Sequence, residues 1–104
     1  MSESQWIDAA PVADVPAEDV IGIIVGARDI ALYNVDGEIY ATDNLCTHGH
    51  ARLCDGFLEG HEIECPLHQG KFHIATGKAV GVPCIEDIRV YAVKVEDGAV
   101  LLKE

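Results

Sequence analysis

From Ile30 to Thr42 the chain reads IALYNVDGEIYAT, in which two runs rich in β-branched and aromatic residues flank Asp36-Gly37. Glycine adopts positive φ without steric cost, so this dipeptide favours a tight turn between two antiparallel strands. The same pattern recurs near the end of the chain, where Asp97-Gly98 separates residues 89–95 from residues 99–103. The sequence therefore predicts two β-hairpins.

Two shorter runs extend the expected sheet. Val20–Val25 is rich in β-branched residues and ends at Gly26, and residues 5–8 are a candidate edge strand. Neither run has the length or the capping residues of a helix, and no long helix is expected elsewhere. The predicted fold class is all-β with antiparallel sheets, and 104 residues fit a single domain, 1–104.

Charge and hydropathy exclude several classes of function. Eighteen acidic and seven basic residues give a formal net charge of -11, which disfavours nucleic acid as a partner and favours proteins with basic patches. Residues 1–6 lack the basic and apolar regions of a secretory signal, and Val20–Val25 is far shorter than the roughly 20 residues that cross a bilayer. We therefore expect a cytoplasmic monomer that does not enter a membrane, and cysteines used for metal binding rather than for disulfides.

The chemistry is concentrated between Asn44 and Pro83, a glycine-rich segment that holds all five histidines and three of the four cysteines. Two motifs stand out, Cys46-Thr47-His48 and Cys65-Pro66-Leu67-His68. Each pairs a thiolate with an imidazole inside a tight turn and has a glycine shortly after it. This arrangement suits a [2Fe–2S] cluster in which one iron takes two cysteines and the other takes two histidines. The candidate cofactor ligands are Cys46, His48, Cys65 and His68.

Such a mixed ligand set predicts one-electron chemistry. Replacing two thiolates by neutral imidazoles makes the cluster less negative, which eases its reduction. A structural zinc site with the same four ligands is the alternative, although zinc motifs usually separate paired ligands by two or more residues and Cys46 and His48 have only one between them. The sequence shows no nucleophile paired with a base, phosphate-binding loop or dinucleotide fingerprint. An electron carrier is therefore expected rather than an enzyme.

With these motifs the chain resembles the Rieske-type ferredoxins of bacterial aromatic ring-hydroxylating dioxygenase systems, of the naphthalene and biphenyl dioxygenase type. The resemblance covers nearly the whole chain and is strongest over residues 39–49, 63–72 and 75–78. It implies a Rieske fold, in which antiparallel sheets form a base and residues 44–83 form a cluster-binding loop subdomain. It also implies that one electron passes from a ferredoxin reductase to the terminal oxygenase. The small Rieske subunit of a reductase complex, such as a nitrite reductase, is the alternative.

Two departures from the high-potential Rieske proteins of respiratory complexes follow from the same resemblance. Those proteins join the two cluster loops by a disulfide, whereas the corresponding positions here are Ala51 and Leu67. They also place a serine and a tyrosine hydroxyl near the cluster, where this chain has Gly70 and Phe72. Fewer hydrogen bonds to sulfur stabilise the reduced cluster less, so we expect a potential near the low end of the Rieske range, roughly -150 mV.

The remaining cysteines and histidines are interpreted as non-ligands. Cys54 and Cys84 lie outside any Cys/His turn, and a disulfide between them is not expected in the cytosol. His50 follows His48 too closely to replace it and is at most an outer-shell residue. His61 and His73 are expected to flank the second motif as ordinary solvated side chains.

Overall fold

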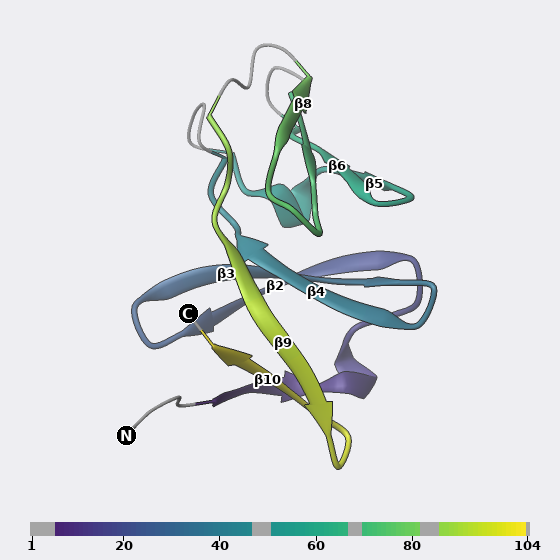
Figure 1. The fold of residues 1–104 in the computed structure, drawn as a ribbon, viewed down its shortest axis with the longest axis vertical. Helices are drawn as coiled ribbons and strands as arrows, with labels where there is room; N and C mark the ends of the chain where they lie inside the picture. Colours follow the sequence, from purple (N-terminus) through teal and green to yellow (C-terminus); the bar gives the residue numbers. More distant parts are fainter. Residues whose placement is uncertain (1–5, 47–50, 67–69, 82–85, 104) are drawn as a thin grey trace.

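The computed structural model describes residues 6–46, 51–66, 70–81 and 86–103. They form two antiparallel sheets, a six-stranded base sheet and a four-stranded small sheet at one end of it (Figure 1). The base sheet has the strand order β1-β10-β9-β4-β3-β2. Its strands are β1 (Ile7–Pro11), β2 (Asp19–Val25), β3 (Arg28–Val35), β4 (Glu38–Asp43), β9 (Val90–Glu96) and β10 (Ala99–Lys103).

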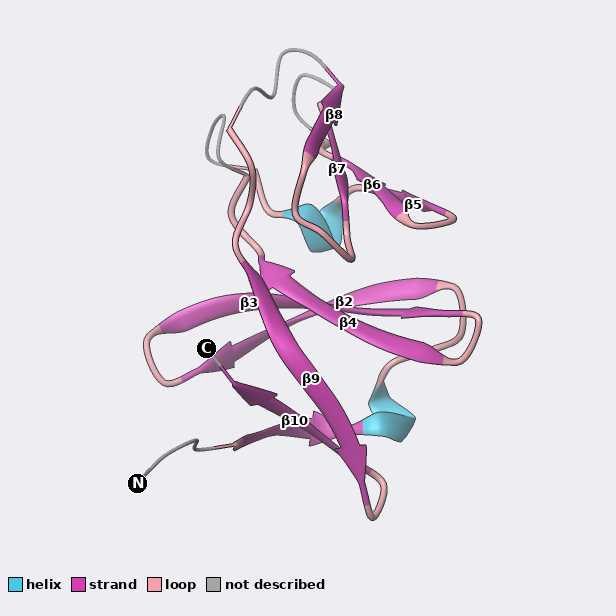
Figure 2. Cartoon of the chain, viewed as in Figure 1, coloured by secondary structure: helices cyan, strands magenta, loops and turns pink. Residues whose placement is uncertain are grey.

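The small sheet is built from strands of three residues each, in the order β5-β6-β7-β8. These strands are β5 (Phe57–Glu59), β6 (Glu62–Glu64), β7 (Lys71–His73) and β8 (Ala79–Gly81). Helical structure in the described ranges is limited to two 3₁₀ turns, η1 (Val12–Asp14) and η2 (Leu53–Asp55) (Figure 2). No helix among these residues is long and apolar enough to cross a membrane. The all-β class predicted from the sequence is confirmed.

Both predicted hairpins are present. Asp36 and Gly37 have φ of 54° and 81°, and Asp97 and Gly98 have φ of 52° and 79°. Positive φ at both central residues is the signature of the type I′ turn, whose twist matches that of the flanking strands. The predicted edge strand is also present, although it begins at Ile7 and continues to Pro11, where it pairs with β10.

Strand β3 lies between two hydrophobic cores. Its four residues from Ile30 to Tyr33 are all at most 2% exposed, because alternate side chains enter opposite cores. Ile30 and Leu32 pack into the core of the base sheet, which also contains Val100 and Leu102. Ala31 and Tyr33 pack into a second core shared with the small sheet. The side chains on this second face of β3 therefore join the small sheet to the base sheet.

Candidate metal centre

The two predicted cysteine ligands lie in the core between the base and the small sheet. Cys46 is 4% exposed and Cys65 is 1% exposed, and both belong to the same buried cluster as Leu53 and Phe72. The structure therefore brings together two thiols that are 19 positions apart in the sequence. The other two predicted ligands, His48 and His68, lie outside the described residues.

The same backbone hydrogen bond closes each of the two ligand loops. The Cys46 amide donates to the Ala51 carbonyl at 2.9 Å, and the Cys65 amide donates to the Gly70 carbonyl at 2.7 Å. In both loops the donor is the cysteine and the acceptor lies five positions later. Each cysteine is thereby fixed at the first position of a closed loop, which is a feature that the sequence motifs alone do not reveal.

The second ligand loop is supported by the ladder between the two strands that flank it. Strands β6 and β7 pair Glu64 with Lys71 and Ile63 with Phe72 directly behind Cys65. Gly56 supports this loop from the other side, because a Cβ there would lie 2.0 Å from the Glu64 carbonyl oxygen. Only glycine permits this close approach. Nothing in the sequence marks this role beyond the glycine itself.

The first ligand loop is mounted on the base sheet instead. It leaves β4 through Asn44, which is completely buried, and returns through Arg52, which forms an isolated bridge with Leu45. Asn44 and Arg52 are functional candidates that the sequence motifs did not identify.

The resemblance to Rieske proteins implies that two hydroxyl groups near the cluster of the high-potential members are missing here. Phe72 occupies one of these two positions. The ring is fully buried in the core that holds both cysteines, and a phenylalanine offers no hydrogen-bond donor there. Gly70 likewise contributes its carbonyl to loop closure and has no side chain to offer. These two positions therefore offer no side-chain donor to a cysteine sulfur.

Cys54 and the histidines that were predicted as non-ligands have other contacts. Cys54 is a free thiol whose Sγ accepts a hydrogen bond from Asn44 Nδ2 at 3.2 Å. His61 and His73 are half-buried rather than simply solvated. Their rings stack at 6.0 Å, and Tyr40 of β4 meets His61 edge-on at 5.6 Å. The stacked pair therefore helps to attach the small sheet to the base.

No rival metal site is found among the residues that the structure describes, where no group of three His, Cys, Asp or Glu side chains gathers. Cys84 and His50 fall outside these residues. Two buried thiols at the first positions of twin closed loops fit the cysteine half of the predicted ligand set. Their burial also suits a thiolate-bound cluster, whose potential depends on exclusion of solvent.

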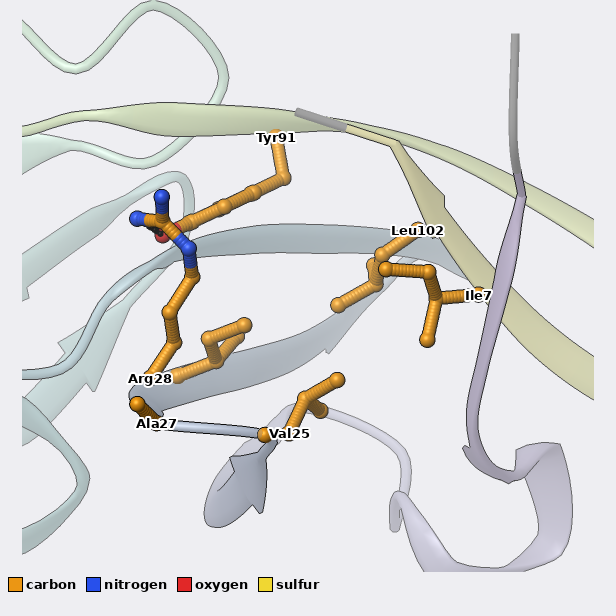
Figure 3. Close-up of a pocket in the computed structure, with 8 residues that line it drawn as sticks. Ile7, Val25, Ala27, Arg28, Tyr91 and Leu102 are labelled. Atoms are coloured by element: carbon orange, nitrogen blue, oxygen red, sulfur yellow. Dashed lines mark hydrogen bonds between the residues drawn. The ribbon is translucent and has the colours of Figure 1, made fainter.

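An apolar cavity of about 310 Å³ lies in the base (Figure 3). Its walls include Ile7, Val25 and Leu102, and Arg28 lies at its polar end, where Arg28 Nη1 donates to the Tyr91 hydroxyl at 3.3 Å. Because Ile30 and Leu102 of its lining belong to the base core and not to the core with the cysteines, the cavity is not part of the metal centre.

Comparisons with known proteins identify the family of the chain. The model of the Rieske [2Fe–2S] domain matches residues 5–92. The chain is 62% identical over 98 residues to the ferredoxin component of naphthalene 1,2-dioxygenase/salicylate 5-hydroxylase systems of a Ralstonia species, with 94% of each chain covered. Among solved structures, it is similar to a ferredoxin of Sphingomonas yanoikuyae B1, with a TM-score of 0.91, 44% identity, and 96% of this chain and 99% of that chain covered. It is also similar, at a TM-score of 0.87 and 36% identity, to a chain in the complex of reduced oxygenase and oxidised ferredoxin of carbazole 1,9a-dioxygenase, with 94% of this chain and 92% of that chain covered.

Proposed function

Because the chain belongs to the Rieske [2Fe–2S] domain family, we propose that Cys46, His48, Cys65 and His68 hold its cluster, with both cysteines on one iron and both histidines on the other. The cofactor is a Rieske-type [2Fe–2S] cluster, which supplies one-electron oxidation and reduction when bound. The observation that carries the ligand proposal is the pair of twin closed loops, each beginning with a buried cysteine. We propose that residues 44–83 are the cluster-binding part of one domain.

The protein is an electron-transfer ferredoxin that serves an oxygenase. We propose that its electron comes from a ferredoxin reductase and goes to the terminal oxygenase of an aromatic ring-hydroxylating dioxygenase system, within the cytoplasm. The name of the Ralstonia relative supports an aromatic hydrocarbon or aromatic acid as the substrate of that system. In this proposal the chain is a monomeric carrier, and the substrate pocket belongs to the oxygenase.

The surface beside the candidate centre supports a protein partner. Leu45, next to Cys46, is 52% exposed, and Val80 of the small sheet is 47% exposed. Exposed apolar side chains next to a redox centre favour a short-lived protein contact. The formal net charge of -11 adds long-range attraction to a partner with basic patches and makes the encounter sensitive to salt.

The ligand proposal is tested by metal analysis and by EPR of the dithionite-reduced protein. We expect equimolar iron and acid-labile sulfide, and an average g-value lower than that of an all-cysteine cluster. Cys46→Ser and Cys65→Ser should each abolish the signal, whereas the matched Cys54→Ser variant should keep it, because Cys54 is outside both ligand loops and a serine oxygen there still accepts a hydrogen bond from the Asn44 amide. A protein with zinc and no sulfide, or loss of the signal in Cys54→Ser alone, would refute the ligand set.

The partner proposal is tested by reconstitution of aromatic hydroxylation. Purified reductase, this ferredoxin and a terminal oxygenase of the naphthalene dioxygenase class should consume the aromatic substrate only when all three are present. The Cys46→Ser variant is the matched negative control. Hydroxylation at the same rate without the ferredoxin would contradict the carrier role, and a failure with every such pair of partners would contradict the dioxygenase assignment.

A further inference from the structure

A polar network around the buried Asn44 lies next to the first ligand loop. It consists of Asp29 at the start of β3, Asn44 at the exit of β4, and Arg52 and Cys54 on the return of the loop, and we call it the Asp29–Asn44 network. Asn44 is 0% exposed and is two positions before Cys46. A buried side-chain amide is retained in a core only when its polar atoms are satisfied.

Every hydrogen-bonding group of Asn44 has a partner. Its Nδ2 donates to Asp29 Oδ1 at 3.0 Å and to Cys54 Sγ at 3.2 Å, and its Oδ1 accepts from the Cys54 amide at 2.8 Å. Its backbone amide donates to the Asp29 carbonyl at 2.9 Å, and its carbonyl accepts from the Leu53 amide at 2.6 Å. The residue therefore ties the entry of the loop to β3 and to the segment by which the loop returns.

Asp29 holds the exit of the loop as well. Arg52 Nε donates to Asp29 Oδ2 and Arg52 Nη2 donates to Asp29 Oδ1, both at 3.0 Å. These bonds hold the pKa of the Asp29 carboxyl below its usual value, because they favour its ionised form. A bidentate arginine–carboxylate pair fixes orientation as well as distance. One carboxylate thus clamps both ends of the loop that begins with Cys46.

Gly22 of β2 provides the space for this network. A Cβ at this position would lie 2.7 Å from Cys54 Sγ, 2.9 Å from Asn44 Nδ2 and 3.1 Å from Arg52 Nη2. Any larger residue would push at least one member of the network out of place. The absence of a side chain at Gly22 therefore leaves the space in the base sheet that the network occupies.

The two ligand loops differ in what supports them. The second loop is held by three paired positions of β6 and β7. Among the described residues, the first loop is flanked by one isolated bridge, between Leu45 and Arg52, and by the backbone hydrogen bond from Leu53 to Asn44. The side chains of the Asp29–Asn44 network add the support that a strand ladder gives to the second loop. On this asymmetry we propose that Asp29, Asn44 and Arg52 are positioning residues, which hold the first loop in the geometry that the cluster requires. The inference rests on the proposed function.

The test compares two variants with the same chemical change in the holo-protein. Asn44→Leu removes the amide of the network at nearly constant volume. Asn34→Leu is the matched control, because Asn34 also lies on the base sheet but its Nδ2 donates to the Val15 carbonyl, at 3.1 Å, outside both ligand loops. We measure visible circular dichroism, the average g-value of the reduced protein and the rate at which a chelator bleaches the cluster.

For Asn44→Leu we expect bleaching about tenfold faster than for the parent, the lower end of the effect usually seen for partners of metal ligands, with a changed visible circular dichroism spectrum. Asn34→Leu should keep the parent spectrum. If Asn44→Leu does not fold, Arg52→Met gives the same test from a half-exposed position, and faster bleaching is again expected.

Equal spectra and equal bleaching rates for the parent and for both network variants would overturn the positioning role. Equal acceleration in Asn34→Leu and Asn44→Leu would overturn it too, because the effect would then be general loss of stability. A parent protein without iron and sulfide would instead refute the proposed function itself.

Discussion

Gly77→Ala should destabilise the fold much more than Gly98→Ala, although the two glycines have the same backbone conformation. Both have φ of +79°, so an alanine at either position meets the left-handed penalty of about 1–2 kcal/mol. At Gly98 nothing lies within 4 Å of the new Cβ, whereas at Gly77 the Ile88 carbonyl oxygen would lie 2.2 Å away. The difference between the two variants therefore isolates the cost of that contact.

The contact at Gly77 also involves hydrogen bonds that anchor the chain on its return to the base. The Gly77 amide donates to the His73 carbonyl at 2.7 Å, and the Ile88 amide donates to the Gly77 carbonyl at 2.8 Å. Overpacking costs about 1–3 kcal/mol, and one weakened hydrogen bond adds about 1 kcal/mol. Gly77→Ala should therefore lose roughly 2–4 kcal/mol more than Gly98→Ala.

The assay is urea unfolding of the holo-protein, followed by far-ultraviolet circular dichroism, with thermal unfolding as a second measurement. A domain of this size loses about 4–8 °C in Tm for each kcal/mol, so the Tm of Gly77→Ala should fall at least about 8 °C below that of Gly98→Ala. Similar midpoints for the two variants would show that the close approach of Gly77 to Ile88 is absent in solution.

Three further predictions concern the core and the pH range of stability. Burial raises the pKa of Tyr33 above its ordinary value of 10.0, and the hydrogen bond between Tyr33 and Thr42 opposes this rise in part. The neutral phenol therefore stabilises the fold below about pH 10, and this stabilisation is lost as the pH rises further. The urea midpoint should fall at alkaline pH, and it should fall less steeply in Tyr33→Phe. Ile63→Ala removes a fully buried side chain from the core that holds both cysteines and should cost about 2–5 kcal/mol, measured by urea unfolding; a loss below about 1 kcal/mol would contradict tight packing there. Phe72→Tyr adds a hydrogen-bond donor beside the cysteines. If its hydrogen bond stabilises the reduced cluster by about 1 kcal/mol, the reduction potential should rise by roughly 40 mV in protein-film voltammetry. An unchanged or lower potential would show that the hydroxyl does not reach a sulfur.

The parts of the fold that the sequence predicts are those decided by neighbouring residues. The turns at Asp36-Gly37 and Asp97-Gly98 need only a pair of residues that accept positive φ, and β3 needs only its own run of β-branched and aromatic residues. By contrast, β4 pairs with β9, and this pairing joins Ala41 to Tyr91, which is fifty positions later in the sequence. Such a pairing depends on burial in the folded chain and has no local signal. Strands of three residues, such as β6, are too short to show a period at all.

The same distinction applies to the candidate centre. Cys46 and Cys65 stand out in the sequence because thiols and imidazoles recur at short spacing, a local pattern, and their role as ligands stays a prediction. Gly56 and Asn44 could not, because their roles depend on Glu64 and Asp29, which are brought to them only by the fold. His48 and His68 lie outside the described residues and remain predictions from the motifs and the family.

Strand β3 makes the base and the metal centre parts of one structure. Ile30 and Leu32 support the base core, and Ala31, Tyr33 and Val35 support the core with the cysteines. Asp29 at the start of the strand bonds to both ends of the first ligand loop. A shift of this strand by one residue would exchange its two faces and also withdraw the Asp29 carboxylate from Asn44. The register of one strand in the base therefore sets the contacts of the first ligand loop, and the hairpin turn at Asp36-Gly37 contributes to the site by fixing that register.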